Sequence, residues 1–320
     1  MKVIKNIIVP TGNIIIAEGE KHKPLEFLSI GDYGKEKNLK ADFLGLKKEI
    51  NGVPHGNLLP LEEKWVITIS TQYGCSMNCT FCDVPKVGPG INVTFNDLIR
   101  QVLEGIKLHP EVSFTKRLNI HFARMGEPTW NPDVLDATKW FKEHIDPEYK
   151  IHPVVSTMMP RKNEWLKTFI HTWMRLKNRR LKGEAGLQIS LNSTEQRERD
   201  KMFNKNACSL EEIHNIMRDI IPNGRKITLN MALCDYTINV KTLRKWFNPM
   251  DYIVKITPMH KTDACTKNNL KTAEGYEQYY PYKQIEEDLK NEGFDVIVFI
   301  PSKEEDESKI TCGNAILATM

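Results

Sequence analysis

The sequence predicts an α/β protein in which helices cover a parallel sheet. Two observations lead to this fold class. After residue 64, apolar runs of strand length alternate with segments of helical periodicity, and together they form six strand-then-helix units. Parallel strands need long crossover connections, and helices provide them. The alternation is equally compatible with an open doubly wound sheet and with a partial barrel.

The predicted strands are short and rich in β-branched and other apolar residues. They span residues 65–70 (WVITIS), 118–123 (LNIHFA), 151–156 (IHPVVS), 186–191 (GLQISL), 227–233 (ITLNMAL), 252–257 (YIVKIT) and 295–300 (DVIVFI).

The predicted helices lie between these strands. The first, residues 94–106, opens on Thr94 with Asp97 three residues later, which is close to a capping box. The second, residues 131–145, has proline at an early helical position, where a missing N–H is tolerated. The clearest of the others span residues 161–177, 209–221 and 282–294.

Residues 1–60 have a different pattern. Short apolar strands there are split by turn-forming stretches, namely PTGN, GEK, GDYGK and NGVPHG. We therefore expect a small β-rich N-terminal extension over residues 1–60 and a main domain over residues 61–320.

Composition narrows the class of protein. The 320 residues are 40% hydrophobic, enough for a sizeable core, but no apolar run is long enough for a membrane span. Asn6 and Pro10 interrupt the first apolar stretch and no small-residue cleavage site follows, so we expect a cytoplasmic protein without an export signal. Seven cysteines in such a protein favour metal binding or catalysis over a disulfide framework.

Positive charge is modest overall and uneven along the chain. The net charge of +4 is compatible with nucleic acid but does not indicate it. Residues 175–182 form a basic run with two interpretations, a solvated helix end or a surface that contacts phosphates.

Three of the seven cysteines stand within eight positions, in QYGCSMNCTFC. Cys75, Cys79 and Cys82 directly follow a predicted strand, so one tight loop presents three thiolates to a metal centre. Structural zinc sites usually need four ligands, and no second pair of Cys or His has a suitable spacing. A [4Fe-4S] cluster on three cysteines leaves one iron open to an outside ligand. Structural zinc and buried free thiols remain the alternatives.

This motif after the first strand of a βα array resembles the radical S-adenosylmethionine (SAM) superfamily. The resemblance implies a partial (β/α)6 barrel, a [4Fe-4S] cluster held by the three cysteines, and SAM bound through its amino and carboxylate groups to the open iron. The stretch MGEP, residues 125–128, follows the second strand. In the superfamily a Gly-Glu element at this place contacts the SAM amino group, so the resemblance assigns Gly126 and Glu127 to SAM.

From Gln72 onward the chain also resembles the RlmN/Cfr family, which methylates adenine in RNA. The matching stretches occur in the family's order: QYGCSMNCTFC, FARMGEPTWN, VVST, QISLNSTEQRERDKMFNKN and TCGNAILA. The resemblance implies that further residues line the SAM site, namely Ser156, Ser190, Asn192 and, after the sixth strand, His260. Strand-end capping is the alternative for the two serines, and helix capping for Asn192.

The stretch TCGNAILA resembles the family's C-terminal Cys-Gly motif, which assigns the methyl-carrying thiol to Cys312. In the family that cysteine is methylated by one SAM, and the radical from a second SAM activates its S-methyl group for addition to adenine. The thiolate must be a good nucleophile placed near the sulfonium methyl. An inert buried cysteine is the alternative.

Three features depart from the family. Thr68 stands where the family has a second catalytic cysteine; Cys208, Cys234 or Cys265 could substitute in space, and we favour Cys265 because its loop borders the site. The β-rich stretch stands where the family has a helical domain that engages RNA. The family's proton-accepting acid aligns with His55, which is a candidate base or a surface turn residue.

We therefore expect a cytoplasmic radical SAM methyltransferase acting on adenine C2 or C8 of rRNA or tRNA, with a flavodoxin-like electron donor and no membrane partner. Thr68 and the missing helical domain favour one alternative, a radical SAM enzyme that modifies a nucleotide, small molecule or protein without methyl transfer. A nucleic-acid-binding module with structural zinc is a second alternative from another class.

Overall fold

The computed structural model of the chain describes residues 1–32, 49–50, 53–54, 59–272, 282–301, 303–312 and 314–319. Its main sheet has ten described strands in the order β1-β2-β3-β6-β9-β10-β11-β12-β13-β14. The parallel part comprises β6 (Trp65–Ile69), β9 (Thr115–Phe122), β10 (Tyr149–Thr157), β11 (Gly186–Ser190), β12 (Ile227–Leu233), β13 (Tyr252–Pro258) and β14 (Asp295–Val298).

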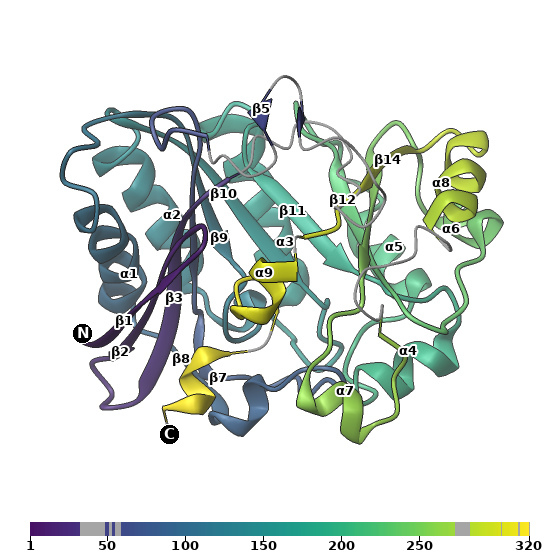
Figure 1. The fold of residues 1–320 in the computed structure, drawn as a ribbon. Coiled ribbons are helices and arrows are strands. Elements are labelled where there is room, and N and C mark those ends of the chain that lie inside the picture. Colours follow the sequence, from purple (N-terminus) through teal and green to yellow (C-terminus); the bar gives the residue numbers. More distant parts are fainter. Residues whose placement is uncertain are drawn as a thin grey trace.

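The parallel strands follow one another across the sheet in chain order. A doubly wound sheet would reverse its order at a switch point, and no reversal occurs between β6 and β14. The sheet therefore winds in one direction and forms the wall of a partial barrel (Figure 1). This confirms the predicted fold class, because six crossovers join the seven parallel strands.

Most of the longer helices lie outside the wall. In Figure 1, α1 and α2 cover the left part of its outer face, and α5, α6 and α8 cover the right part. The helices are α1 (Phe95–Lys107), α2 (Asp133–His144), α3 (Leu166–Arg175), α4 (Gln196–Met202), α5 (Leu210–Met217), α6 (Val240–Trp246), α7 (Asp263–Lys267), α8 (Tyr282–Asn291) and α9 (Lys303–Glu307).

Helix starts follow their sequence signals. The Thr94 side chain accepts a hydrogen bond from the backbone N–H of Asp97 and so caps α1, as predicted. A full capping box forms at α5, where Ser209 and Glu212 bond to each other's backbone N–H groups. The basic run falls on a π-helical turn, Leu176–Arg180, at the end of α3.

The two faces of the wall differ in burial. Along β12 the residues alternate, with Ile227, Leu229, Met231 and Leu233 buried and the residues between them half-buried. The buried set packs into one large hydrophobic core with the helices. The half-buried set faces the inside of the barrel, so the concave side of the wall remains accessible.

The N-terminal strands extend the same sheet. Antiparallel β1 (Lys2–Val9), β2 (Gly12–Glu18) and β3 (Pro24–Gly31) form a meander, and β3 pairs with β6. The β-rich N-terminal part is therefore confirmed. The division of the chain at residue 60 stays a prediction. Two short hairpins complete the strands: β4 (Glu49–Ile50) with β5 (Val53–Pro54), and β7 (Gln72–Gly74) with β8 (Pro89–Asn92).

The C-terminal segment, residues 303–319, crosses the open side of the barrel, as α9 shows in Figure 1. It runs from β14 at one edge of the sheet back to β3. Arg124 donates hydrogen bonds to the carbonyls of Lys309 (2.7 Å) and Ile310 (3.3 Å). Ile310 packs with Ile14 and Leu28 from β2 and β3. Within the described ranges, no helix is long and apolar enough to cross a membrane.

Candidate active site

The three clustered cysteines lie on the loop that follows β7, at the carboxyl end of the barrel strands. Figure 1 shows β7, β8 and α7 together at this end of the molecule. Asn78, between the first two cysteines, has a φ of 52°, and the Cys82 N–H bonds the Cys79 carbonyl at 3.2 Å. The loop therefore turns tightly, and it brings the three thiols close enough to act on one another's ionisation.

The three thiols are held in their neutral form. Burial raises the pKa of Cys75 to about 11, although the N–H of Met77 acts in the opposite direction. Burial, followed by the other two thiols, raises the pKa of Cys79 well above its ordinary value. Burial, followed by Cys75 and Cys312, raises that of Cys82. Among the described residues, the ionisable groups that influence these thiols are carboxyl groups and other thiols, which all raise the thiol pKa values.

This donor set fits an iron–sulfur cluster. Thiolates need positive charge nearby, and iron provides it when it binds. Within the described residues, no three His, Cys, Asp or Glu side chains converge on a single ion. A cluster does not require that convergence, because each cysteine binds a different iron.

An apolar shell encloses the cysteine loop. Met77 and Cys79 pack with Met202, Phe203 and Ala207. Phe81, the aromatic residue of the motif, meets Phe203 edge to face with ring centroids 5.8 Å apart. Low polarity around a cluster limits water access and tunes its redox potential.

Helix α7 docks against the same loop. Asp83 accepts hydrogen bonds from the backbone N–H groups of Asp263 (3.1 Å) and Ala264 (3.0 Å). Thr262 donates its hydroxyl to the Phe81 carbonyl at 2.8 Å. The loop after β13 thus holds the cluster loop in place, although the bonded residues lie 180 and 181 positions apart in the sequence.

Gly126 lies against the strand that leads into the cysteines. Its φ is +92°, and an added Cβ would come 2.5 Å from the Gln72 side chain, so only glycine fits there. Gln72 accepts hydrogen bonds from the Glu127 N–H (3.1 Å) and the Ser76 hydroxyl (3.2 Å). Gln72 therefore joins the Gly-Glu turn to the cluster loop. Sequence reasoning missed this residue, although it stands three positions before Cys75.

Glu127 is 2% exposed, and both of its carboxylate oxygens accept hydrogen bonds. One carboxylate oxygen accepts from the N–H (3.1 Å) and hydroxyl (2.8 Å) of Thr129, and the other accepts from the Met158 N–H at 2.8 Å. Burial raises the pKa of Glu127, while the bonds from Met158 and Thr129 act against that rise. The carboxylate ties the turn after β9 to the end of β10, and its contact with the SAM amino group stays a prediction.

The other residues assigned to SAM lie at the ends of β10, β11 and β13. The Ser156 hydroxyl accepts a hydrogen bond from Gln188 at 3.4 Å, and Ser190 is 9% exposed at the end of β11. Asn192 has a φ of 59° and accepts a hydrogen bond from the Ala232 N–H at 2.9 Å. It does not cap a helix, because α4 begins at Gln196. The His260 ring lies 2.9 Å from the Asp306 carboxylate of α9.

Cys312 lies near the cluster loop. The electrostatic influence of Cys312 contributes to the raised pKa of Cys82, although the two lie 230 positions apart in the sequence, so the C-terminal segment brings Cys312 within electrostatic range of the loop. The segment is held by Glu26, which accepts hydrogen bonds from the N–H of Ile316 (2.6 Å) and from Asn314 (3.3 Å). Glu26 is fully buried and also pairs with Arg124. Sequence reasoning missed this ion pair, and no local pattern indicates it.

Thr68 faces the inside of the barrel from β6, level with His121 on β9. Of the remaining thiols, Cys265 is fully buried and lies 3.6 Å from the Phe81 carbonyl. Cys234 is half-buried beside the apolar shell of the cluster loop. Burial raises the pKa of Cys234 to about 12. Both sulfurs lie at the cluster end, and their chemical use stays a prediction.

Two further predictions concern His55 and the basic run at residues 175–182. His55 lies outside the described residues. The basic run is only partly a surface feature: Arg175, Arg179 and Arg180 are exposed, whereas Lys177 is buried and donates to the Asn223 carbonyl. Burial lowers the pKa of Lys177 to about 8.

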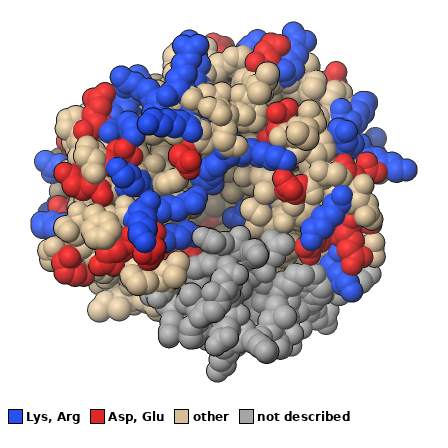
Figure 2. Space-filling model, turned by 90° about the horizontal axis from the view of Figure 1, so that it is seen from above, with Lys and Arg blue, Asp and Glu red and all other residues tan. Residues whose placement is uncertain are grey.

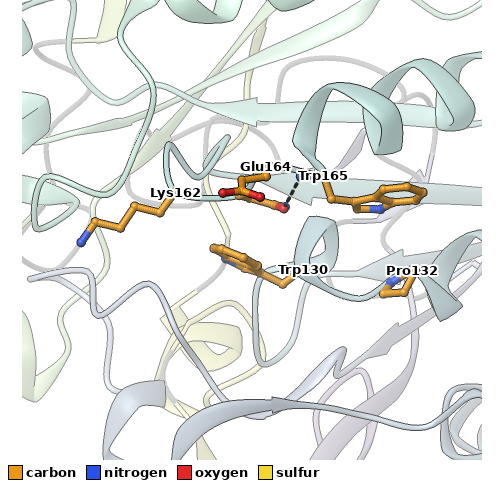
Figure 3. A pocket seen from close by; sticks show the side chains of 6 residues that line it. Trp130, Pro132, Lys162, Glu164 and Trp165 are labelled. Carbon is orange, nitrogen blue, oxygen red and sulfur yellow. Dashed lines mark hydrogen bonds between the residues drawn. The ribbon is translucent and has the colours of Figure 1, made fainter.

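A pocket of about 480 Å³ opens beside the turn that follows Glu127 (Figure 3). Trp130 and Pro132 form one side, and Glu164 and Trp165 form the other, while Lys162 points away. None of the predicted site residues lines this pocket. The cysteines, rather than the pocket, define the candidate active site.

Comparison with protein families identifies the class. A profile described as the radical SAM superfamily matches residues 69–246, more than half of the chain. The chain belongs to the radical SAM superfamily. It is therefore an enzyme of a class that uses a [4Fe-4S] cluster and SAM, in agreement with the cysteine loop.

Within the superfamily, the chain is similar to RNA methyltransferases. It is 32% identical over 95 residues to the dual-specificity RNA methyltransferase RlmN of Campylobacter lari, covering 30% of this chain and 26% of that one. It is 24% identical over 210 residues to the probable RlmN of Aquifex aeolicus, covering 64% and 55%. The chain thus spans between a quarter and just over half of these relatives.

A solved structure shares the fold. A radical SAM methyltransferase from Sphaerobacter thermophilus matches with a TM-score of 0.66 at 18% identity, covering 93% of this chain and 76% of that one. At this identity the match supports the fold and not the reaction.

Proposed function

We propose that this chain is a radical SAM enzyme that methylates an adenine of RNA, with Cys312 as the methyl carrier. The observation that supports the proposal is that the C-terminal segment crosses the open side of the barrel and brings Cys312 within electrostatic range of Cys82. The similarity to RlmN-type proteins supports RNA as the substrate class. A flavodoxin-like electron donor and a cytoplasmic location belong to the same proposal.

Cys75, Cys79 and Cys82 would hold the cluster, and Gly126, Glu127, Ser156, Ser190, Asn192 and His260 would surround SAM. Together these cofactors supply the methyl group and the radical. The Cys312 thiol accepts the methyl group as a thioether, and its proton must leave because only the thiolate is a strong nucleophile. The apolar shell around Met77 and Phe203 keeps water away from the reacting groups.

Peptide mass spectrometry of anaerobically purified protein tests this proposal. We expect the peptide containing Cys312 to carry the mass of one added methyl group. A Cys234→Ala variant should keep that modification, and a Cys312→Ala variant should lose it while retaining iron and SAM cleavage. Unmodified Cys312 in protein that still cleaves SAM would reject the carrier mechanism.

One observation favours a second candidate function, modification of a nucleotide, small molecule or protein without methyl transfer. Thr68 occupies the position that holds a second catalytic cysteine in the RlmN/Cfr family, and threonine cannot act as a thiol. This candidate predicts SAM cleavage with an unmodified Cys312. A Thr68→Cys variant separates the two: it should increase RNA methylation only if Cys312 carries the methyl group.

A further inference from the structure

Two tryptophans border the pocket that opens beside the turn after Glu127 (Figure 3). Trp130 ends the short 3₁₀ turn Pro128–Trp130, which follows β9. Trp165 directly precedes α3, in the connection that follows β10. Both walls are therefore loops at the carboxyl ends of barrel strands, where active sites of such barrels are built. The pocket lies at the same end of the barrel as the cysteine loop.

Asparagine side chains fix both walls of this pocket. Asn163 donates to the Thr129 carbonyl at 2.8 Å and accepts from the Trp165 N–H at 3.1 Å, so it joins the two walls. Asn92 of β8 donates to the Trp130 carbonyl at 2.7 Å. The pocket is therefore preformed, and a ligand does not have to order its walls on binding.

The same bonds connect the pocket to Glu127. Thr129 donates its hydroxyl to the Glu127 carboxylate at 2.8 Å, and its carbonyl accepts from Asn163. The pocket wall is thus linked through Thr129 to the carboxylate that is predicted to contact SAM. None of the predicted cluster or SAM residues lines the pocket itself. A group bound there therefore lies beside the reacting groups and is not the group that reacts.

The pocket presents aromatic faces. Trp165 is 44% exposed, although its indole is large and apolar. The Trp130 N–H is buried and has no hydrogen-bond partner among the described residues, so this indole contributes its ring rather than its donor. Pro132 lines the same side as Trp130 (Figure 3). Indole faces stack on nucleobases, and a volume of about 480 Å³ is in the range of small-ligand sites.

Two charged side chains flank the aromatic rings. Lys162 and Glu164 are both exposed, and within the described ranges neither side chain forms an ion pair. In Figure 3, Glu164 lies on the pocket wall, whereas Lys162 extends away from the pocket. A carboxylate on the wall repels phosphate and accepts from amino groups, and a lysine outside attracts phosphate. Charge therefore favours a base inside the pocket with its phosphate outside, near Lys162.

We propose that this pocket holds a base of the RNA strand that neighbours the reacting adenine, stacked against Trp165 and Trp130. The proposal rests on RNA as the substrate class and adds a second contact for the strand. The Glu164 carboxylate accepts hydrogen bonds from exocyclic amino groups. Adenine, cytosine and guanine therefore fit the pocket better than uracil, which has no amino group.

The opposite end of the barrel has a different kind of surface. Figure 2 looks onto that end and shows Lys and Arg side chains around a depression in the described surface. The basic run at residues 175–182 belongs to that end, because it stops four positions before β11 begins. Phosphate contacts on such a surface make binding depend on salt, whereas stacking on an indole neutralises no phosphate. Salt dependence therefore distinguishes the two surfaces.

The experiment measures binding of short single-stranded RNA to the cluster-loaded full chain without reductant, so that no turnover occurs. The probes are oligoadenylate and oligouridylate at several salt concentrations, and oligoadenylate with one 2-aminopurine, whose fluorescence falls when the base stacks. The main variants are Trp165→Ala and Trp165→Phe. Phe114→Ala is the matched control, because Phe114 is 51% exposed and directly precedes β9, at the opposite end of the barrel.

We expect Trp165→Ala to weaken oligoadenylate binding about tenfold without changing the logarithmic salt slope, because it removes a stacking surface and no phosphate contact. Trp165→Phe should restore most of the affinity, and Phe114→Ala should not change it. The 2-aminopurine fluorescence should fall on binding to the wild type and fall less with Trp165→Ala. Equal affinity and fluorescence for wild type and Trp165→Ala, or no RNA binding by the wild type, would overturn the pocket.

Two further variants test how the nucleotide is oriented. Glu164→Ala should lower the ratio of oligoadenylate to oligouridylate affinity about threefold, since it removes the acceptor for the amino group. Lys162→Gln should reduce the logarithmic salt slope by about 0.7, the loss of one phosphate contact on a single strand. An unchanged ratio and an unchanged slope would overturn the placement of the base inside and the phosphate outside.

A peptide containing trimethyllysine is the competing probe, because aromatic pockets also bind methylated ammonium groups through cation–π attraction. Peptide binding that is lost in Trp165→Ala, together with RNA affinity that is indifferent to Trp165, would overturn the assignment to RNA. The proposed function is tested separately. An unmodified Cys312 would reject the methyl-carrier mechanism, and a stacking effect at Trp165 would still support the pocket.

Discussion

The cluster loop, residues 72–92, and the C-terminal segment, residues 303–319, both supply cysteines to the candidate site, but they are held in different ways. The ends of the cluster loop pair with each other in the β7–β8 hairpin, and Gln72 bonds Gly90 and Asn92 within it at 3.0 Å. The C-terminal segment is positioned by Arg124 and Glu26, which are 185 and 290 positions away from the residues they bond.

The difference shows why residue spacing predicts how the three loop thiols are arranged but does not predict where Cys312 lies relative to them. Loop geometry is a local property, so residue spacing alone predicts it. The position of Cys312 depends on a buried ion pair between β3 and the turn after β9. Disrupting the cluster loop should therefore affect cluster assembly, whereas disrupting the C-terminal segment should affect Cys312.

The largest expected effect comes from the loop itself. Cys82→Ala should abolish cluster assembly, because three thiolates are the smallest set that holds a [4Fe-4S] cluster here. Iron and sulfide analysis with electron paramagnetic resonance measures it. Cys208→Ala is the control, since Cys208 is a buried cysteine of the main hydrophobic core and is not part of the loop motif. Full iron content and SAM cleavage in Cys82→Ala would refute the ligand assignment.

The second effect concerns the anchor of the C-terminal segment. Arg124→Met leaves the Glu26 carboxylate buried without its partner, which costs about 3–5 kcal/mol of folding stability. We expect faster hydrogen exchange in residues 309–316 and loss of Cys312 methylation, while the cluster still assembles. Arg100→Met, at an exposed position on α1, is the control.

A second, milder substitution in the same contact keeps the test interpretable if Arg124→Met unfolds the whole protein. Ile310→Ala removes the apolar contact with Ile14 and Leu28 and keeps the ion pair. It should loosen the segment to a smaller degree. If both variants left the exchange of residues 309–316 unchanged, the anchor would lie elsewhere.

The third effect separates crowding from backbone conformation at Gly126, near the proposed SAM site. Gly126→Ala combines a φ of +92° with a contact of 2.5 Å to Gln72, whereas Gly293→Ala has a similar φ of +89° and no contact closer than 3.9 Å. Both should lose roughly 1–2 kcal/mol of stability from left-handed geometry. Only Gly126→Ala should also weaken SAM binding, measured by calorimetry. Equal SAM affinity in the two variants would remove the Gly126 turn from the site.

The smallest effect concerns the outer basic surface. Arg179→Glu combined with Arg180→Glu should weaken RNA binding and lower its salt dependence, because each lost phosphate contact reduces the logarithmic slope by about 0.7 for single strands. Lys177 is excluded because it is buried. Arg244→Glu serves as the control, and identical salt slopes for all three proteins would limit these arginines to a solvated surface.

Prediction from the sequence succeeded where short-range patterns dominate. The strand at 227–233 has the predicted bounds, because alternating apolar residues there meet one buried face. Helix α3 is shorter than its predicted range, and the basic run continues as a π-helical turn with Lys177 inside. Charge alone did not reveal that a lysine in this run would donate to a buried carbonyl.

The sequence by itself determined the parallel wall, the cysteine loop and the Gly-Glu turn, because hydrophobic period, ligand spacing and glycine conformation are properties of neighbouring residues. Tertiary structure decided that Cys312 lies within electrostatic range of Cys82 and that Arg124 and Glu26 hold the C-terminal segment. Those residues lie far apart in the sequence, and only the winding of the barrel and a buried ion pair bring them together. Distances of this kind depend on packing across the whole chain, which no local pattern encodes.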